Sequence, residues 1–275
     1  MISVFKKRTR RLKRLSGFSL IVIILGLAGS LFSQANWAVS SSLTINSGDY
    51  IYQQRTDNYY LNAGLRYSAQ KWTVSASVPF ILQNSAVYQQ EPISFSANGH
   101  GMNNPTTTTL SNNLEAGIGD IYLYGEYQLW NGSLIAPSVV MTTQLKVPTT
   151  NRLTLFSTGK FDYGLGLALR KWVKTFNAFA EISYLRIGDQ EEITYLDPLG
   201  YGLGIGKFFA NGKYSTSLYF KGYSKIIQGV DPPRQLALGF FTMFSGKSVL
   251  SFYLIKGLSE SSPDFGLSSG IDWKL

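Results

Sequence analysis

Residues that could carry acid–base or nucleophilic chemistry are scarce in this 275-residue chain, which contains no cysteine and one histidine. The absence of thiols excludes disulfides, thiolate zinc sites, iron–sulfur clusters and cysteine nucleophiles. Acyl transfer needs a serine beside a histidine base, but His100 stands between glycines among loop-forming residues. Paired carboxylates such as Glu191 and Glu192 could do acid–base work, yet nothing in the sequence places a substrate between them. We therefore predict no catalytic residue, no metal site and no cofactor.

A larger set of polar residues has in common its place in the alternating sequence pattern and not one type of chemistry. Each alternates with apolar neighbours, so on a β-strand it would lie on the face opposite the apolar one. The set comprises Arg66, Asp120, Tyr122, Tyr124, Glu126, Gln144, Lys146, Asp162, Arg170, Glu181 and Lys221. Charges of both signs on one enclosed face would either pair or line a wet path, because an unpaired enclosed charge is unfavourable. The first arrangement would be a ladder that props a closed structure, formed by Asp120, Glu126, Lys146 and Arg170. The second would be the selective lining of a pore, and the sequence leaves both open.

The formal charge of +9 belongs mainly to the start of the chain. Seven basic residues and no acidic one occur from Lys6 to Arg14, so the remainder is close to neutral. Neutralising phosphates requires a basic surface on the folded domain. We therefore predict no nucleic-acid partner.

The same basic run begins a three-part export signal. An uncharged stretch of 18 residues, 15–32, follows it, and Ser33 and Ala35 supply small residues at positions −3 and −1 of a cleavage site. We predict that residues 1–35 are a signal peptide and that the mature protein starts at Asn36. An uncleaved transmembrane helix is the alternative, because a stretch of this length can span a bilayer.

From Asn36 onward, apolar residues recur at every second position. Between Phe161 and Arg170 the odd positions are large and apolar, and the even positions are small or charged. The segments with this pattern are 37–47, 58–67, 71–82, 115–129, 134–146, 160–172, 176–187, 199–209, 214–226, 235–244, 248–256 and 264–275. Tight turns and longer gaps alternate between them, the longest gap being 83–114. This arrangement predicts an all-β fold, an antiparallel transmembrane β-barrel of about 12 strands over 36–275, preceded by the signal peptide, with 83–114 as a long outer loop.

Soluble β-folds are the alternatives to a membrane barrel. A β-sandwich or a lipocalin-like barrel turns its apolar face inward, and its core needs dense apolar packing. Here the other face carries Gly, Ser, Thr, Asn, Gln and scattered charges, which suit a lumen. Aromatic residues also gather at predicted strand ends, where membrane barrels have aromatic girdles. They are Trp37, Tyr59, Tyr67, Trp72, Tyr127, Trp172, Phe209, Tyr214 and Trp273.

The central third of the chain carries three short motifs. They are GIGD at 117–120, LKVPT at 145–149 and STGKFDYGLG at 157–166. Their order and spacing resemble the outer-membrane family named for the meta-pathway of phenol degradation, with Thr150 where that family's pattern has glycine. The resemblance implies an outer-membrane transporter or channel.

We therefore expect a cell outer-membrane channel or transporter for the uptake of small solutes, hydrophobic or aromatic ones included. Its expected partners are outer-membrane lipids, a small-molecule solute and the barrel-assembly machinery, which reads a terminal strand like the one ending at Leu275. A structural or adhesive barrel without transport, with 83–114 presented outward or folded inward, is one alternative. A lipid-modifying enzyme that uses His100 as its base is another.

Overall fold

The computed structural model describes residues 36–50, 55–83, 115–150, 159–188 and 195–275, which form one unit. The predicted signal peptide, His100, the Glu191–Glu192 pair and loop residues 84–114 lie outside the described residues. Gln83, expected in the outer loop, ends a strand. No helix among the described residues is long and apolar enough to cross a membrane.

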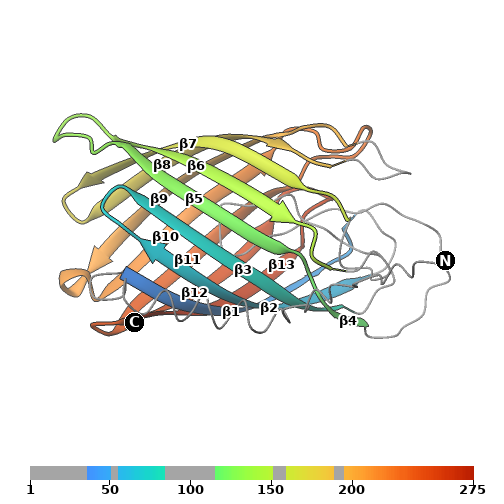
Figure 1. Ribbon diagram of the computed structural model, residues 1–275, viewed down its shortest axis with the longest axis horizontal. Helices are drawn as coiled ribbons and strands as arrows, with labels where there is room; N and C mark the ends of the chain where they lie inside the picture. The colour runs from blue at the N-terminus through green and yellow to red at the C-terminus, as the bar shows by residue number, and fades with distance from the viewer. Residues whose placement is uncertain (1–35, 51–54, 84–114, 151–158, 189–194) are drawn as a thin grey trace, which may run out of the picture. The chain divides into compact units, whose positions relative to one another are not determined.

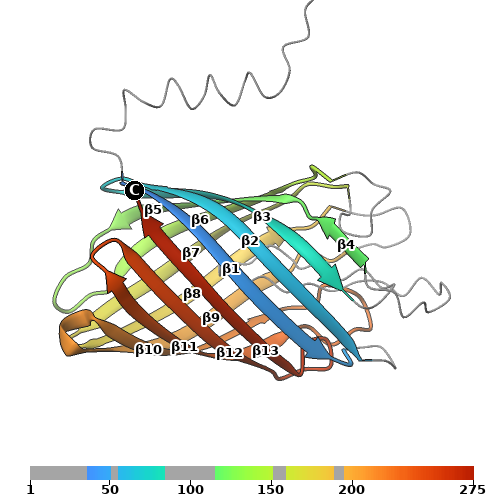
Figure 2. The same ribbon diagram turned by 90° about the horizontal axis from the view of Figure 1, so that it is seen from below.

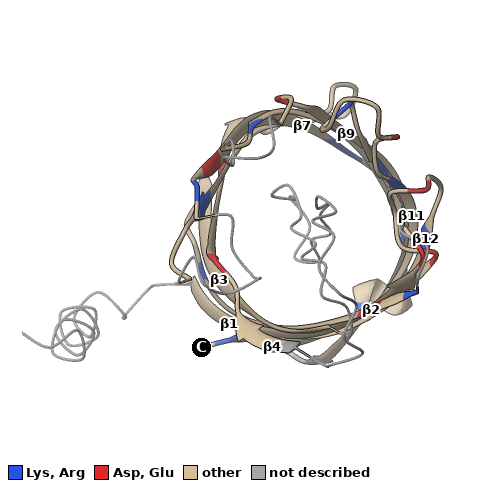
Figure 3. Cartoon of the chain, turned by 90° about the vertical axis from the view of Figure 1, so that its right-hand side faces the viewer, with Lys and Arg blue, Asp and Glu red and all other residues tan. Residues whose placement is uncertain are grey.

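Thirteen β-strands form a single antiparallel sheet that closes on itself (Figures 1 and 2). The strands are β1 (Asn36–Gly48), β2 (Thr56–Ser68), β3 (Trp72–Gln83), β4 (Glu115–Ile118), β5 (Ile121–Trp130), β6 (Ser138–Val147), β7 (Asp162–Val173), β8 (Phe176–Arg186), β9 (Leu199–Phe209), β10 (Tyr214–Tyr223), β11 (Arg234–Ser245), β12 (Ser248–Gly257) and β13 (Phe265–Lys274). The barrel closes because β1 pairs with both β2 and β13, and viewed end-on the strands make a ring around the interior (Figure 3). Since β4 and β5 both pair with β3 and share one position, the barrel has twelve positions. The predicted all-β antiparallel barrel of about 12 strands is confirmed.

The outer wall of the barrel is apolar on every side. Large apolar side chains face outward at alternate positions and stay exposed, as Leu165 on β7 and Leu203 on β9 do at 56% and 61%. Their strand neighbours Gly164, Gly166 and Gly202 face inward. Because a closed ladder satisfies its backbone hydrogen bonds internally, such a wall can face hydrocarbon.

The fourth position of the barrel is split, which the sequence pattern did not predict. Residues 115–129 were expected to form one strand, but the ladder breaks at Gly119 and Asp120. Opposite the break lies Pro79 of β3, which has no N–H to donate and accepts a hydrogen bond from the Gly119 backbone N–H at 2.8 Å. A side chain at Gly119 would meet the Pro79 ring. The proline therefore interrupts the pairing and fixes the glycine beside it.

Five of the connections are short and lie at one end of the barrel, here called the turn end; the opposite end is called the loop end. At the turn between β9 and β10, Asn211 and Gly212 both have positive φ, as a tight hairpin requires. The turn between β5 and β6 is longer than predicted, because residues 134–137 belong to the turn and not to the strand. The Lys171 ammonium holds this turn by donating hydrogen bonds to three of its backbone carbonyls.

Both ends of the barrel chain lie at the turn end, where the backbone N–H of Leu275 donates a hydrogen bond to the carbonyl of Trp37. Trp37, Tyr67 and Trp72 form an aromatic row on the outer wall there, with ring centres about 5 Å apart. Trp172, expected in the same belt, instead contacts Phe208 on the inner side of the wall, with the two ring planes tilted by 40°. Its register partner Asn177 also faces the interior, which explains the difference.

Candidate functional site

The interior of the barrel holds a chamber of about 590 Å³ in its turn-end half. Strands β5 to β12 contribute to its wall. Five aromatic side chains line it, namely Phe179, Phe208, Tyr219, Phe241 and Tyr253. The volume is within the range of small-molecule pockets. The chamber is therefore the candidate functional site.

Strand β9 provides the room that these aromatic rings occupy. Its inward positions are glycines from Gly200 to Gly206, and a side chain at Gly204 would overlap the Phe179 ring. A side chain at Gly202 would meet the hydroxyl of Tyr219. Phe179 and Tyr219, from the strands on either side of β9, thus approach across it, with ring centres 5.3 Å apart.

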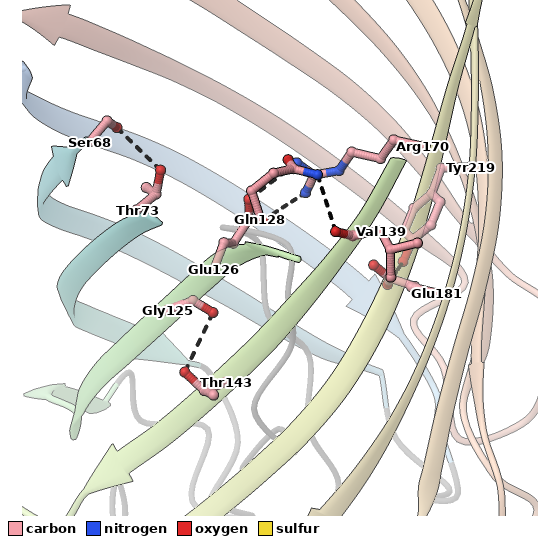
Figure 4. A network of polar contacts seen from close by, with 10 residues as sticks. All are labelled: Ser68, Thr73, Gly125, Glu126, Gln128, Val139, Thr143, Arg170, Glu181 and Tyr219. Atoms are coloured by element: carbon pink, nitrogen blue, oxygen red, sulfur yellow. Dashed lines mark hydrogen bonds and ion pairs between the residues drawn. The ribbon is translucent and has the colours of Figure 1, made fainter. Parts of the chain in front are cut away.

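Polar contacts across the inner wall repeatedly bridge two strands that are not neighbours. The Arg170 guanidinium on β7 donates two hydrogen bonds to the Glu126 carboxylate on β5, at 2.7 and 3.2 Å, over the small Thr142 of β6 (Figure 4). The side chains of Arg66 and Asp272 pair at 3.0 Å over β1 in the same way. Small inward residues on the middle strand let long side chains meet above it.

The third bridge is a hydrogen bond from Tyr219 to Glu181. The phenol of Tyr219 on β10 donates to the Glu181 carboxylate on β8 at 2.5 Å, above Gly202 of β9 (Figure 4). Glu126, Arg170 and Glu181 all line the chamber. Of the eleven residues expected at the lumen, these three line the chamber.

The charged residues Lys146 and Asp162 form a buried ion pair. Lys146 on β6 lies opposite Asp162 on β7, and the ammonium is 2.7 Å from the carboxylate, with side-chain exposures of 0% and 4%. The same carboxylate accepts a hydrogen bond from the backbone N–H of Gly188. The pair therefore links β6 and β7 to each other and to the connection that follows β8, at the loop end.

Asp120 has a local structural role at the loop end. Its carboxylate accepts hydrogen bonds from the backbone N–H groups of Thr149 and Thr150, at 3.1 and 3.2 Å. The hydroxyl of Thr150, in turn, donates to the carbonyl of Ile118 at 2.8 Å. The expected ladder of Asp120, Glu126, Lys146 and Arg170 therefore separates into two ion pairs and one loop anchor, since the acidic partner of Lys146 is Asp162.

The remaining expected residues lie in the interior nearer the loop end. Tyr122 and Tyr124 of β5 are register partners of Lys146 and Gln144. Both amide atoms of Gln144 are buried without a hydrogen-bond partner in the described structure. The ammonium of Lys221 on β10 is 5.1 Å from the centre of the Tyr223 ring. The structure thus places these four residues outside the chamber wall.

Described segments of two connections pack over the interior at the loop end. Tyr195 and Ile226 are buried together with Leu185 and Tyr223 from the strands. A backbone hydrogen bond of 2.8 Å from Leu196 to Ile226 joins the two connections. The loop end is consequently more tightly packed than the chamber at the turn end.

Several residues at the site were not predicted from the sequence. They are the inward aromatic residues Phe179, Phe208, Tyr219, Phe241 and Tyr253, and Asp272, the partner of Arg66. The alternation that marked Glu181 also places Phe179 on its face. Alternation alone therefore predicts Phe179 in the interior, as it does Tyr122 and Tyr124. Within the described residues, no group of three or more His, Asp or Glu side chains could hold a metal ion.

The closed ladder, the apolar outer wall and the polar interior define an outer-membrane β-barrel with an internal chamber. No family model and no curated protein matches the chain. Among solved structures, it is similar to an outer membrane channel from Pseudomonas putida F1, with 15% identity, 88% of this chain and 96% of that chain covered, and a TM-score of 0.66.

Two further solved structures have the same fold and different roles. The NanC porin is 10% identical over 86% of this chain and 100% of that chain, with a TM-score of 0.54. The translocator domain of the autotransporter NalP from Neisseria meningitidis is 10% identical over 94% of each chain, with a TM-score of 0.52. At these identities the similarity shows the fold alone, so function has to be argued from the interior.

Proposed function

We propose that this protein is an outer-membrane channel for the uptake of small solutes, hydrophobic and aromatic ones included. The observation that carries the proposal is the chamber of about 590 Å³ lined by five aromatic side chains inside a closed barrel. Aromatic and aliphatic side chains with a few placed polar groups are the usual lining of small-molecule sites. The motif resemblance to the family named for the meta-pathway of phenol degradation supports the same function.

The proposed path runs from the loop end to the turn end. In bacterial barrels the short turns and the chain termini face the periplasm, so the chamber would open on that side. Export would use the predicted signal peptide, which would be cleaved after Ala35, and insertion would use the barrel-assembly machinery. The interior residues Tyr122, Tyr124, Gln144 and Lys221 would lie on the path above the chamber.

A structural barrel without transport is the second candidate. The packing at the loop end favours it, since Tyr195, Tyr223 and Ile226 are buried against one another. Lys146 is also buried there without measurable exposure. A barrel closed at this end would not conduct.

Planar-bilayer recording of the purified mature protein tests the channel proposal. We expect discrete current steps from the wild type and a smaller step from Gly206→Phe, which adds a ring at the chamber wall. Ile205→Phe adds a similar ring to the outward face of the same strand and should leave the step unchanged. Absence of current, with residues 84–114 present and with them deleted, would contradict the channel function and leave the structural one.

A further inference from the structure

The charges that line the chamber are unevenly matched. Glu126 is neutralised by Arg170, whose guanidinium makes two hydrogen bonds to it. Lys213 also lines the chamber, but its ammonium is 5.3 Å from the centre of the Tyr214 ring, which belongs to the outward face of β10. Glu181 makes no ion pair within 4.0 Å in the described part of the chain, and its carboxylate accepts a hydrogen bond from the neutral Tyr219 hydroxyl. The chamber wall therefore carries one carboxylate without a directly paired cation.

Lys221, an inward cation two strands away from Glu181, does not fill this role. Lys221 is two strands from Glu181, across Gly202, and the two interact electrostatically at longer range. Its ammonium lies over the Tyr223 ring, and Lys221 is not part of the chamber wall. The carboxylate of Glu181 thus remains available on the chamber side.

Aromatic rings lie beside this carboxylate and along the chamber wall. Phe179 and Tyr219 flank Glu181 on β8 and β10, and Phe241 and Tyr253 form an edge-to-face pair elsewhere in the wall, with ring centres 5.3 Å apart. The face of an aromatic ring carries negative partial charge and attracts cations, and several rings around one space form a cage for ammonium groups. The aromatic rings and the Glu181 carboxylate therefore both favour a positively charged solute.

The side chain of Asn177 adds a further hydrogen-bond acceptor to the chamber wall. It lies on β8, four residues before Glu181 and on the same face, and lines the chamber. Its side-chain oxygen is buried and has no hydrogen-bond partner in the described structure. A buried acceptor without a partner is unfavourable unless a ligand or water supplies a donor.

We propose that the chamber binds and passes small organic cations, in which an ammonium group is attached to an apolar or aromatic group. The ammonium group would lie between the Glu181 carboxylate and the rings of Phe179 and Tyr219, and the apolar part would contact the rings of Phe241 and Tyr253. An anion would be repelled by Glu181, while Arg170 is already engaged by Glu126. A neutral aromatic solute would use the rings but leave Glu181 without a counter-ion. This inference rests on the proposed channel function and names its class of solute.

The test compares binding and conduction of benzyltrimethylammonium with those of benzoate. Binding to the full mature protein in detergent is measured by titration calorimetry, and block of the potassium chloride current is measured in planar bilayers. Glu181→Gln removes the charge but keeps an oxygen that can accept the Tyr219 hydroxyl. Glu260→Gln removes one negative charge at an exposed turn of the loop end and is the matched control. Phe179→Leu keeps the carboxylate and removes one ring.

We expect benzyltrimethylammonium to bind and block at concentrations at least about tenfold lower than benzoate. Glu181→Gln should weaken this binding by about tenfold or more and reduce the preference for potassium over chloride, whereas Glu260→Gln should change neither. Phe179→Leu should weaken binding of the organic cation while leaving the potassium preference in place. Equal binding of the two probes, or no effect of Glu181→Gln in a conducting channel, would overturn the inference alone. Glu181-dependent cation binding by a protein that carries no current would support the cation site and contradict the channel.

Discussion

The buried ion pair of Lys146 and Asp162 should be the polar contact whose loss destabilises the barrel most. Lys146→Met removes the cation and leaves the Asp162 carboxylate, 2.7 Å away and 4% exposed, without its charge partner. Removing one member of a buried pair typically lowers the free energy of unfolding by about 3–5 kcal/mol. The pair of Arg170 and Glu126 offers a comparison, since its N–O distance is also 2.7 Å but each side chain is 40% exposed.

Equilibrium unfolding by urea in phospholipid vesicles, followed by tryptophan fluorescence, measures both losses. Arg170→Met should lower the free energy of unfolding by about 0–1 kcal/mol, because solvent screens an exposed pair. The double substitution Lys146→Met/Asp162→Asn should regain much of the loss caused by Lys146→Met alone, because no buried charge remains and the asparagine oxygen can still accept the Gly188 N–H. Equal losses at Lys146 and Arg170, or simple additivity in the double variant, would refute the argument from burial.

Three further predictions concern the wall, the loop anchor and export. Leu203→Arg should lower the free energy of unfolding by about 2–4 kcal/mol because it places a charge in hydrocarbon, whereas Leu134→Arg, at a fully exposed turn position, should change it by less than about 0.5 kcal/mol; equal effects in urea titrations would contradict the lipid-facing assignment. Asp120→Ala should speed hydrogen exchange at the two amides that follow Pro148, and unchanged protection would show that the carboxylate does not hold them. Intact-mass measurement of protein extracted from outer membranes should give a chain that starts at Asn36, and retention of residues 1–35 would indicate an uncleaved anchor.

The strands were predictable because period-two alternation is a local property. On β7, Leu165 and Leu167 face lipid while Gly164 and Gly166 face the interior, and the sequence alone shows that difference. The break at Gly119 was not visible, because it depends on Pro79 of another strand. Likewise, Leu134 and Ile135 have strand-like apolar side chains, but Lys171 holds the surrounding backbone in a turn through three carbonyls.

The pairing of interior charges was less predictable than their positions. Alternation placed Lys146 and Glu126 on the inner face, but several opposite charges share that face. The register puts Asp162 directly opposite Lys146, while Arg170 reaches over a strand to Glu126. Register and the size of the intervening side chains decide these partners, and both are properties of the assembled barrel.

The most direct test of the central claim asks whether solutes reach the chamber through the barrel. Because the chain has no cysteine, Ser217→Cys provides a single thiol at the chamber wall, and Leu203→Cys provides one on the lipid-facing side of a neighbouring strand. A charged, membrane-impermeant thiol reagent should reduce the single-channel current of the Ser217→Cys variant and leave that of the Leu203→Cys variant unchanged. An unchanged current after labelling of Ser217→Cys, or an equal reduction in both variants, would contradict a path through the chamber.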